Sequence, residues 1–231
     1  MMGKYKILDE VKKEGRSILT EFESKRILKQ IGIPVIDTRL AKNLKEALSI
    51  SQSIGFPVVL KITSPDVVHK TDSGGVRLGL RNGSEVKKAY DDILRSVKKK
   101  YPRALIHGIS VQKMAPPGTE VIIGTSKDPQ FGPVIMFGLG GIFVEVLKDV
   151  SFRIIPVGRK DAREMIQEIK GFPLLQGYRG KEPASIPALV EMILKISKLI
   201  NENPGIREME LNPVLAYKDK ALAVDARIIL E

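Results

Sequence analysis

A lysine in an apolar run is the first residue whose type and place suggest chemistry. Residues 57–62 predict a buried strand, and Lys61 is its only charged member. An ammonium group that is buried without a partner is costly. Two interpretations fit this pattern: the side chain reaches solvent from the strand end, or it projects into a cleft and binds phosphate oxygens.

The segment that follows, residues 63–76, begins with a polar loop and carries further candidates. Gly74 and Gly75 would let the backbone approach a ligand closely and present N–H groups to phosphate, although a tight turn alone would also explain them. His69, one of two histidines in the chain, lies in the same loop. A surface position is the default for such a histidine. The functional alternatives are a general base, a metal ligand or a nucleophile that carries a phosphoryl group.

The last two predicted strands carry oxygen donors. By the two-residue period of a strand, Glu208, Glu210 and Asn212 share one face. Asp225 lies among apolar residues of the next strand, where a buried carboxylate needs a partner. In a hairpin, Asn212 and Asp225 converge, and their oxygens suit a Mg²⁺ ion that also binds nucleotide phosphates. A solvated acidic face is the alternative.

These candidates together predict a nucleotide site without a P-loop. Neither G-x-x-x-x-G-K-[ST] nor G-x-G-x-x-G occurs in the sequence. A strand lysine, a glycine-containing loop and a pair of oxygen donors would have to hold the phosphates instead.

The composition of the 231-residue chain narrows the class of protein. Lys and Arg number 38 against 27 acidic residues, a net charge of +11, while aromatic residues make up 5% and Trp is absent. Spread along the chain, this charge favours a polyanionic small molecule over a nucleic-acid partner. The absence of Cys excludes disulfides and thiolate chemistry. Without a bilayer-spanning apolar run or a signal peptide, we expect a cytoplasmic protein with no membrane partner.

Helix and strand patterns alternate along the chain. Thr20 and Glu23 form a capping-box pattern for a helix that ends at Gly32. Further helices are predicted for residues 43–55, 84–100, 160–170 and 183–203, and strands for residues 35–40, 57–62, 75–80, 106–114, 119–126, 132–137, 208–217 and 221–228. The result is an α+β fold in two halves that meet around residues 111–115, with a cleft.

Six segments in a fixed order carry a resemblance to a known family. They are residues 57–61 (PVVLK), 69–76 (HKTDSGGV), 118–124 (GTEVIIG), 137–141 (FGLGG), 210–213 (ELNP) and 224–227 (VDAR). From about residue 19 onward, the chain resembles an ATP-grasp domain. It is most similar to the β subunit of ADP-forming acetyl-CoA (acyl-CoA) synthetase, a relative of the succinyl-CoA synthetase β subunit.

The resemblance implies a domain organisation. It is an ATP-grasp fold with two α/β subdomains and a nucleotide cleft between them. Residues 1–18 would be an N-terminal extension, residues 19–110 the first subdomain, and residues 111–231 the second subdomain with a Mg²⁺-binding C-terminal hairpin.

The resemblance also implies how ATP or ADP would be bound. Lys61 would contact the phosphates, and Glu120 would bind the ribose. The segment with Gln112, Lys113 and Met114 would be the hinge whose backbone meets adenine. Relatives of the succinyl-CoA synthetase type often carry an acidic residue where Gln112 stands, so the sequence departs from the pattern there. Asn212 and Asp225 match the Mg²⁺ ligands of the family.

The implied catalytic residues are His69 and Glu210. His69 would receive a phosphoryl group from a phosphohistidine on an α subunit and pass it to ADP, and neutral imidazole is nucleophilic near pH 7. Glu210 would orient the arriving histidine, with a hairpin salt bridge as its alternative. The overall reaction would be acyl-CoA + ADP + phosphate ⇌ acid + ATP + CoA. An α subunit would supply the CoA-binding and ligase domains, in a heterotetramer.

Three other readings compete with this one. An ATP-grasp ligase could form an acyl phosphate without phosphohistidine, and His69 would then be dispensable. A non-catalytic regulatory subunit would bind nucleotide without phosphoryl transfer. A nucleic-acid-binding module would show strongly salt-dependent affinity that is insensitive to changes at Lys61 or Asp225.

Overall fold

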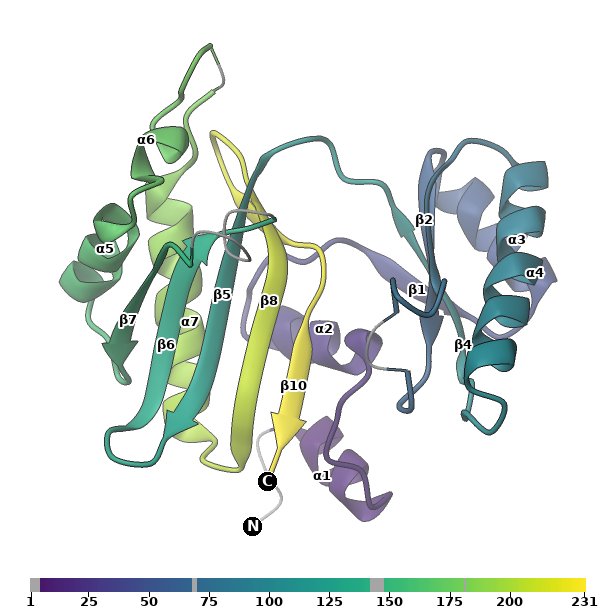
Figure 1. Ribbon diagram of the computed structural model, residues 1–231, viewed down its shortest axis with the longest axis horizontal. Coiled ribbons are helices and arrows are strands. Elements are labelled where there is room, and N and C mark those ends of the chain that lie inside the picture. The colour runs from purple at the N-terminus through teal and green to yellow at the C-terminus, as the bar shows by residue number, and fades with distance from the viewer. Residues whose placement is uncertain (1–4, 68–69, 142–147, 181) are drawn as a thin grey trace. The chain divides into compact units, whose positions relative to one another are not determined.

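A computed structural model describes residues 5–67, 70–141, 148–180 and 182–231 of the chain (Figure 1). The chain divides into two compact units. The first, which we call the large unit, contains Met1–Leu19, Glu23–Val35 and Pro117–Glu231. The second, the small unit, contains Thr20–Phe22 and Ile36–Pro116.

The small unit is built on a four-stranded antiparallel sheet with the order β1-β4-β2-β3. Its strands are β1 (Thr38–Ala41), β2 (Val58–Thr63), β3 (Val76–Leu80) and β4 (Gly108–Lys113). All six residues of β2 are buried, because this strand lies between two others and a helix packs on it. The expectation of a buried strand around Lys61 is confirmed.

Two helices, α3 (Leu44–Ile54) and α4 (Gly83–Lys100), pack on this sheet (Figure 1). Each begins after an asparagine whose side-chain oxygen accepts the backbone N–H three residues on: Asn43 from Glu46 and Asn82 from Glu85, both at 2.9 Å. These caps satisfy amide groups that have no partner within the helix. The apolar sides of the helices and sheet form the core of the small unit.

The turn before β3 depends on a glycine that has no room for a side chain. A Cβ atom on Gly75 would lie 2.6 Å from Cγ2 of Ile62 and 3.0 Å from the carbonyl oxygen of Lys70. We expect Gly75→Ala to lower the free energy of unfolding by about 1–3 kcal/mol, because the added methyl overpacks a buried site. Urea unfolding measures this.

The matched control for Gly75→Ala is the same change at Gly83, in the first turn of α4. There the nearest atom to a new Cβ is Cδ2 of Leu48 at 3.5 Å, an ordinary contact. Gly83→Ala should be neutral or stabilise by up to about 1 kcal/mol, because alanine favours the helix. Equal effects of the two substitutions would contradict the packing argument.

The large unit contains a six-stranded antiparallel sheet with the path β10-β8-β5-β6-β7, and β9 pairs with β8. Its strands are β5 (Thr119–Asp128), β6 (Gly132–Leu139), β7 (Val150–Ile154), β8 (Ile206–Ala216), β9 (Ala221–Ala223) and β10 (Arg227–Leu230). Its helices are α1 (Lys6–Lys13), most of α2 (Glu21–Gln30), α5 (Arg159–Glu168), α6 (Phe172–Leu175) and α7 (Ile186–Glu202).

Helix α7 fills the core on one face of this sheet. The residues of its apolar stripe, Leu189, Val190, Ile193, Ile196 and Ile200, are all buried there. Strands β5, β6 and β8 contribute alternate residues to the same core. By the two-residue period, the intervening residues point from the opposite face.

The division of the chain differs from the predicted boundaries. In the described part of the expected extension, residues 5–18, α1 buries Ile7 and Val11 in the core of the large unit, so this part is not separate from it. The second boundary lies between Pro116 and Pro117, so β4 remains with the small unit instead of beginning a second subdomain. Only Thr20–Phe22 of the N-terminal region groups with the small unit.

Two details of the large sheet also differ from expectation. Strand β7 was not predicted. The expected strand at residues 221–228 is interrupted at residues 224–226, between β9 and β10. At this break Oδ1 of Asp225 accepts the backbone N–H of Ala226 at 2.8 Å. A short polar side chain thus takes a donor that a continuous ladder would use. None of the helices in the described ranges is long and apolar enough to cross a membrane.

Candidate functional site

Lys61 lies in β2 and is 5% exposed. Its Nζ is 2.9 Å from Oε1 of Glu21. The interpretation in which the side chain reaches solvent is therefore wrong. The buried charge is compensated by a carboxylate, as burial of an ammonium group requires.

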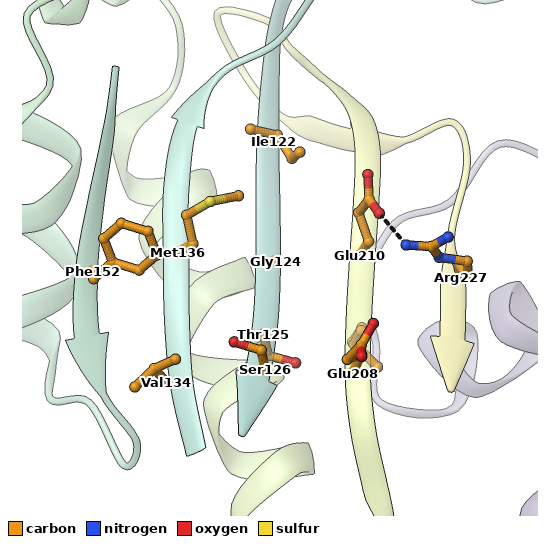
Figure 2. A pocket seen from close by; sticks show the side chains of 11 residues that line it. Ile122, Gly124, Thr125, Ser126, Val134, Met136, Phe152, Glu208, Glu210 and Arg227 are labelled. Atoms are coloured by element: carbon orange, nitrogen blue, oxygen red, sulfur yellow. Dashed lines mark hydrogen bonds and ion pairs between the residues drawn. The ribbon is translucent and has the colours of Figure 1, made fainter. Parts of the chain in front are cut away.

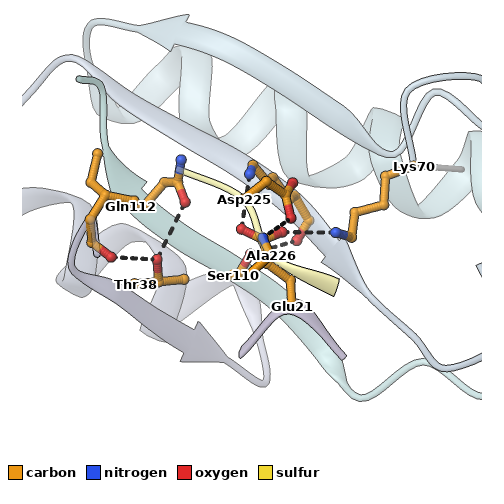
Figure 3. Close-up of polar contacts among 9 residues, drawn as sticks. Glu21, Thr38, Lys70, Ser110, Gln112, Asp225 and Ala226 are labelled. Atoms are coloured by element: carbon orange, nitrogen blue, oxygen red, sulfur yellow. Dashed lines mark hydrogen bonds and ion pairs between the residues drawn. The ribbon is translucent and has the colours of Figure 1, made fainter. Parts of the chain in front are cut away.

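The other carboxylate oxygen of Glu21 binds a second lysine. Oε2 is 2.8 Å from Nζ of Lys70 (Figure 3). The side chain of Glu21 is 4% exposed and that of Lys70 is 18% exposed. The sequence indicated neither Glu21 nor Lys70 as a candidate. Glu21 lies in the first turn of a predicted helix, where a negative charge interacts favourably with the helix dipole, and this alone explains an acidic residue there.

The two glycines of the loop serve the turn itself. The N–H of Gly75 donates to the carbonyl of Lys70 at 2.7 Å, and the N–H of Gly74 donates to that of Thr71 at 3.0 Å. Gly74 has a φ of +68°, which favours glycine. The N–H groups of both glycines thus close the turn, and a close approach of this backbone to a nucleotide stays a prediction. His69 lies outside the described residues.

The predicted hinge is held by the small unit's own contacts. Gln112 is buried, and Oγ1 of Thr38 donates to its Oε1 at 3.3 Å (Figure 3). Nζ of Lys113 donates to the carbonyls of Gly55 at 2.9 Å and of the next residue at 2.8 Å. The N–H of Met114 donates to the carbonyl of Pro57 at 3.0 Å. The contact of this segment with adenine stays a prediction, and it would use backbone groups other than the N–H of Met114.

Glu120 lies in β5 of the large unit and is exposed. Its carbonyl accepts the N–H of Gly140 at 2.7 Å, which places its strand beside the glycine pair at the end of β6. An exposed carboxylate at such a position can accept two hydroxyl groups. The predicted ribose contact stays a prediction.

On β8 the predicted face is confirmed. Glu208, Glu210 and Asn212 are outside the core, while Met209 and Leu211 between them are buried. The carboxylate of Glu210 accepts from two neighbours. Nδ2 of Asn212 donates to Oε1 at 3.1 Å. Nη2 of Arg227 donates to Oε2 at 2.9 Å (Figure 2), so the hairpin salt bridge considered for Glu210 is present.

This face of the sheet carries an open pocket of about 330 Å³ (Figure 2). Carboxylates from β8 and the guanidinium of Arg227 line one side, and apolar side chains from β6 and β7 line the other. The sequence could not reveal this pocket, because its walls come from strands that are distant along the chain. The lining side chains labelled in Figure 2 are Ile122, Thr125, Ser126, Val134, Met136, Phe152, Glu208, Glu210 and Arg227.

The predicted metal ligands lie opposite one another. Val214 pairs with Ala223 on one side of the break and Glu210 pairs with Arg227 on the other. Continuing either register places Asn212 opposite Asp225.

This donor set fits a hard divalent cation. It comprises amide and carboxylate oxygens, which Mg²⁺ prefers. No cluster of three or more His, Asp and Glu side chains suited to a metal occurs within the described part of the chain. A metal at Asn212 and Asp225 would therefore need other oxygens, such as phosphate and water.

Each unit thus contains one group of polar residues. In the small unit the predicted Lys61 contacts Glu21, and Glu21 also contacts Lys70; neither of these two was predicted. The large unit joins Glu210 with Asn212 and sets Asp225 opposite the latter.

Comparison with known families identifies the class of protein. The ATP-grasp domain family matches residues 10–230. The chain therefore belongs to the ATP-grasp family, and the expected α+β ATP-grasp fold is confirmed.

Among proteins of known function, the β subunit of acetate–CoA ligase (ADP-forming) II from Pyrococcus furiosus is 51% identical, covering 98% of this chain and 97% of its own. The β subunit of ligase I from the same organism is 49% identical over 97% and 96% of the two chains. The ADP-forming acetate–CoA ligase I of Archaeoglobus fulgidus is 48% identical, but the match spans only 30% of that longer protein.

Solved structures of similar sequence have the same fold. A chain of acetyl-coenzyme A synthetase 1 from Ca. Korarchaeum cryptofilum, in complex with coenzyme A and Ca-AMPCP, superposes with a TM-score of 0.96 at 51% identity. The match covers 99% of this chain and 100% of that chain. PH1788 from Pyrococcus horikoshii gives a TM-score of 0.94 at 51% identity over 98% and 97%.

Proposed function

We propose that this chain is the nucleotide-binding β subunit of an ADP-forming acyl-CoA synthetase, with acetyl-CoA as the expected substrate. The proposal rests mainly on the match to two β subunits of ADP-forming acetate–CoA ligases. The match covers nearly all of this chain and nearly all of each subunit, and about half of the aligned residues are identical. Lys61, Glu210, Asn212 and Asp225, with the contacts described above, support it.

In the direction of ATP formation, the P–N bond of phosphohistidine 69 breaks and a β-phosphate oxygen of ADP forms the new P–O bond. The ring nitrogen takes the electron pair of the P–N bond, and with a proton on the other ring nitrogen the imidazole leaves neutral. Lys61 would hold phosphate oxygens, since an ammonium group stabilises the charge spread over the transferring group. Asn212 and Asp225 would hold Mg²⁺, which when bound neutralises phosphate charge.

Glu210 would orient the histidine that arrives from a partner. Its carboxylate is already fixed by Asn212 and Arg227, so it can accept from an imidazole N–H in a defined direction. A Korarchaeum structure with 47% identity contains Mg-AMPPCP and a phosphohistidine segment that points towards the nucleotide-binding site. A comparable segment would reach this chain.

The remaining chemistry would come from an α subunit with CoA-binding and ligase domains, in a heterotetramer. In Archaeoglobus the matching segment is part of one longer ligase chain. A 4-hydroxybutyrate–CoA ligase from Nitrosopumilus maritimus and a trans-feruloyl-CoA synthase also contain the segment, as 30% and 31% of their lengths. Since proteins named for different acids share it, we infer that acid selectivity lies outside it.

Phosphoryl transfer to His69 tests the proposal directly. The chain is incubated with Mg²⁺ and γ-labelled ATP, and we expect acid-labile, base-stable label on the protein. His69→Ala should lose this label, because the imidazole of His69 would form the N–P bond.

The chain offers a matched control in His107, its only other histidine. His107→Ala should keep the label. If label is absent, formation of ATP from acetyl-CoA, ADP and phosphate is measured with an added α-type chain. Equal activity of wild type and His69→Ala would favour a ligase without this phosphohistidine, and nucleotide binding without any turnover would favour a regulatory subunit.

A further inference from the structure

A single row of paired residues crosses the large sheet at the pocket of Figure 2. Glu210 pairs with Arg227 on one side and with Gly124 on the other, and Gly124 in turn pairs with Met136. Met136 pairs with Phe152 of β7, the strand at the edge of the sheet. Residues that lie directly opposite one another share a face, and all five line this pocket (Figure 2). The row therefore presents a cation, a carboxylate, a position without a side chain, a thioether and a phenyl ring.

The fold does not require a glycine at position 124. Its φ lies outside the left-handed region, so the backbone there suits other residues. A Cβ atom would lie 3.2 Å from Cε of Met136, the end of a flexible side chain, and 3.9 Å from the carbonyl oxygen of Met209. A glycine inside a strand weakens it and often marks the close approach of a ligand. We call the space above Gly124, between Glu210 and Met136, the Gly124 slot.

The two sides of the slot differ in chemistry. Oε1 and Oε2 of Glu210 accept from Asn212 and Arg227 at 3.1 and 2.9 Å, and each carboxylate oxygen can accept a second hydrogen bond. On the other side, the flexible end of Met136 reaches towards β5, and the ring of Phe152 lies beyond it (Figure 2). A thioether makes favourable contacts with the edge of an aromatic ring. A ligand of the slot therefore needs a hydrogen-bond donor on one edge and a small apolar surface on the other.

The width of the slot suits one small ring. Neighbouring strands lie about 4.8 Å apart, so the backbones of β8 and β6 are separated by about 10 Å across β5. Nonbonded contacts of about 3.5–4.0 Å on each side leave room for a single ring between the side chains. The imidazole of a histidine has this size, and it carries both an N–H group and apolar C–H groups on its edge.

We propose that the Gly124 slot receives the imidazole ring of the histidine that arrives from a partner, with Met136 and Phe152 as its apolar wall. Glu210 accepts the N–H of one ring nitrogen, and the other nitrogen carries the phosphoryl group. This inference rests on the proposed function, in which Glu210 orients that histidine. It adds the residues that select an imidazole.

The test uses 1-phosphoimidazole, which has the ring and the phosphoryl group of phosphohistidine without a peptide. The full chain is incubated with this donor, Mg²⁺ and ADP, and ATP formation is measured at increasing donor concentration. The P–N bond of the donor breaks and a P–N bond to His69 forms. The donor nitrogen takes the electron pair, and neutral imidazole leaves with the proton of its second ring nitrogen. ADP then takes the phosphoryl group from His69 as described above.

Gly124→Val fills the slot. It should lower kcat/KM for 1-phosphoimidazole at least about tenfold, mainly through KM, because the added side chain displaces the ring. Gly124→Ala should lose less, because it adds a single carbon, and it serves if Gly124→Val fails to fold. MgADP affinity, and label on His69 from γ-labelled ATP, should stay within about twofold of wild type, since neither uses the slot. Tm should not fall, because valine favours a strand more than glycine does.

Phe152→Ala tests the apolar wall, and Tyr178→Ala is its matched control. Both are aromatic residues of the large unit with similar exposure, 55% for Phe152 and 49% for Tyr178, but Tyr178 lies outside the pocket. Phe152→Ala should lower kcat/KM for 1-phosphoimidazole about threefold or more, because an aromatic contact is lost. Tyr178→Ala should stay within about twofold of wild type, as expected for a surface residue without this contact.

The outcomes separate this inference from the proposed function. Unchanged kcat/KM in Gly124→Val would overturn the inference alone, and so would a wild type that binds MgADP but does not use 1-phosphoimidazole. Weaker MgADP binding by Gly124→Val would also overturn it, because the slot would then hold part of the nucleotide. Failure of the folded wild type to bind MgADP would instead overturn the proposed function, and this inference with it.

Discussion

Replacing Asp225 by asparagine is expected to slow phosphoryl transfer from MgATP by about a hundredfold or more, because the cation that neutralises phosphate charge would be held weakly. The substitution keeps the side-chain shape and an oxygen that can accept the N–H of Ala226, a contact of 2.8 Å in the structure. The fold should therefore persist while the negative charge is lost. Labelling rate as a function of Mg²⁺ concentration measures the effect.

The Mg²⁺ dependence separates a metal ligand from a merely structural carboxylate. Asp225→Asn should need more Mg²⁺ and should recover in part when Mg²⁺ is raised, because an amide oxygen remains a weak ligand. Asp219→Asn is the matched control, since Asp219 is exposed in the turn between β8 and β9 and undergoes the same change. Unchanged rate and Mg²⁺ dependence in Asp225→Asn would contradict the assignment.

Local patterns predicted much of the fold and part of the site. The period of two on β8 placed Glu208, Glu210 and Asn212 on one face, because side-chain direction in a strand depends only on position. The opposition of Asn212 and Asp225 also follows from local connectivity, since the two segments are joined by a short turn. The interruption around Asp225 did not follow, because a side-chain hydrogen bond replaces the ladder there.

Contacts between distant segments could not be predicted in this way. Glu21 is forty positions from Lys61 in the sequence, and nothing in the first helical turn indicates which strand it faces. The sequence did not indicate Lys70 as a site residue, because charged residues in polar loops usually face solvent. The sequence allowed two interpretations of Gly74 and Gly75, a phosphate contact or a tight turn, and the structure shows the hydrogen bonds of the turn. A charge inside a buried strand is therefore a sound signal that a partner exists, although it does not name the partner.

The N-terminal helix gives the other large expected effect. Ile7 is 4% exposed and Val11 is 1% exposed, although most of the surrounding sequence is charged. Both belong to the core of the large unit. The chain then runs alongside β10, where the N–H of Leu230 donates to the carbonyl of Ser17 at 2.7 Å and that of Leu19 donates to Ile228 at 3.0 Å. Residues 5–19 thus stabilise the large unit.

We expect Ile7→Ala with Val11→Ala to lower the free energy of unfolding by about 4–8 kcal/mol, because each truncation removes buried apolar contacts and leaves a cavity. This is a large part of the roughly 5–15 kcal/mol that stabilises a typical protein. Lys6→Ala, on the exposed side of the same helix, should change stability by less than about 0.5 kcal/mol. Urea unfolding of the three proteins measures both effects. If the double variant were as stable as Lys6→Ala, the packing of α1 would not stabilise the large unit, and α1 would be a dispensable extension.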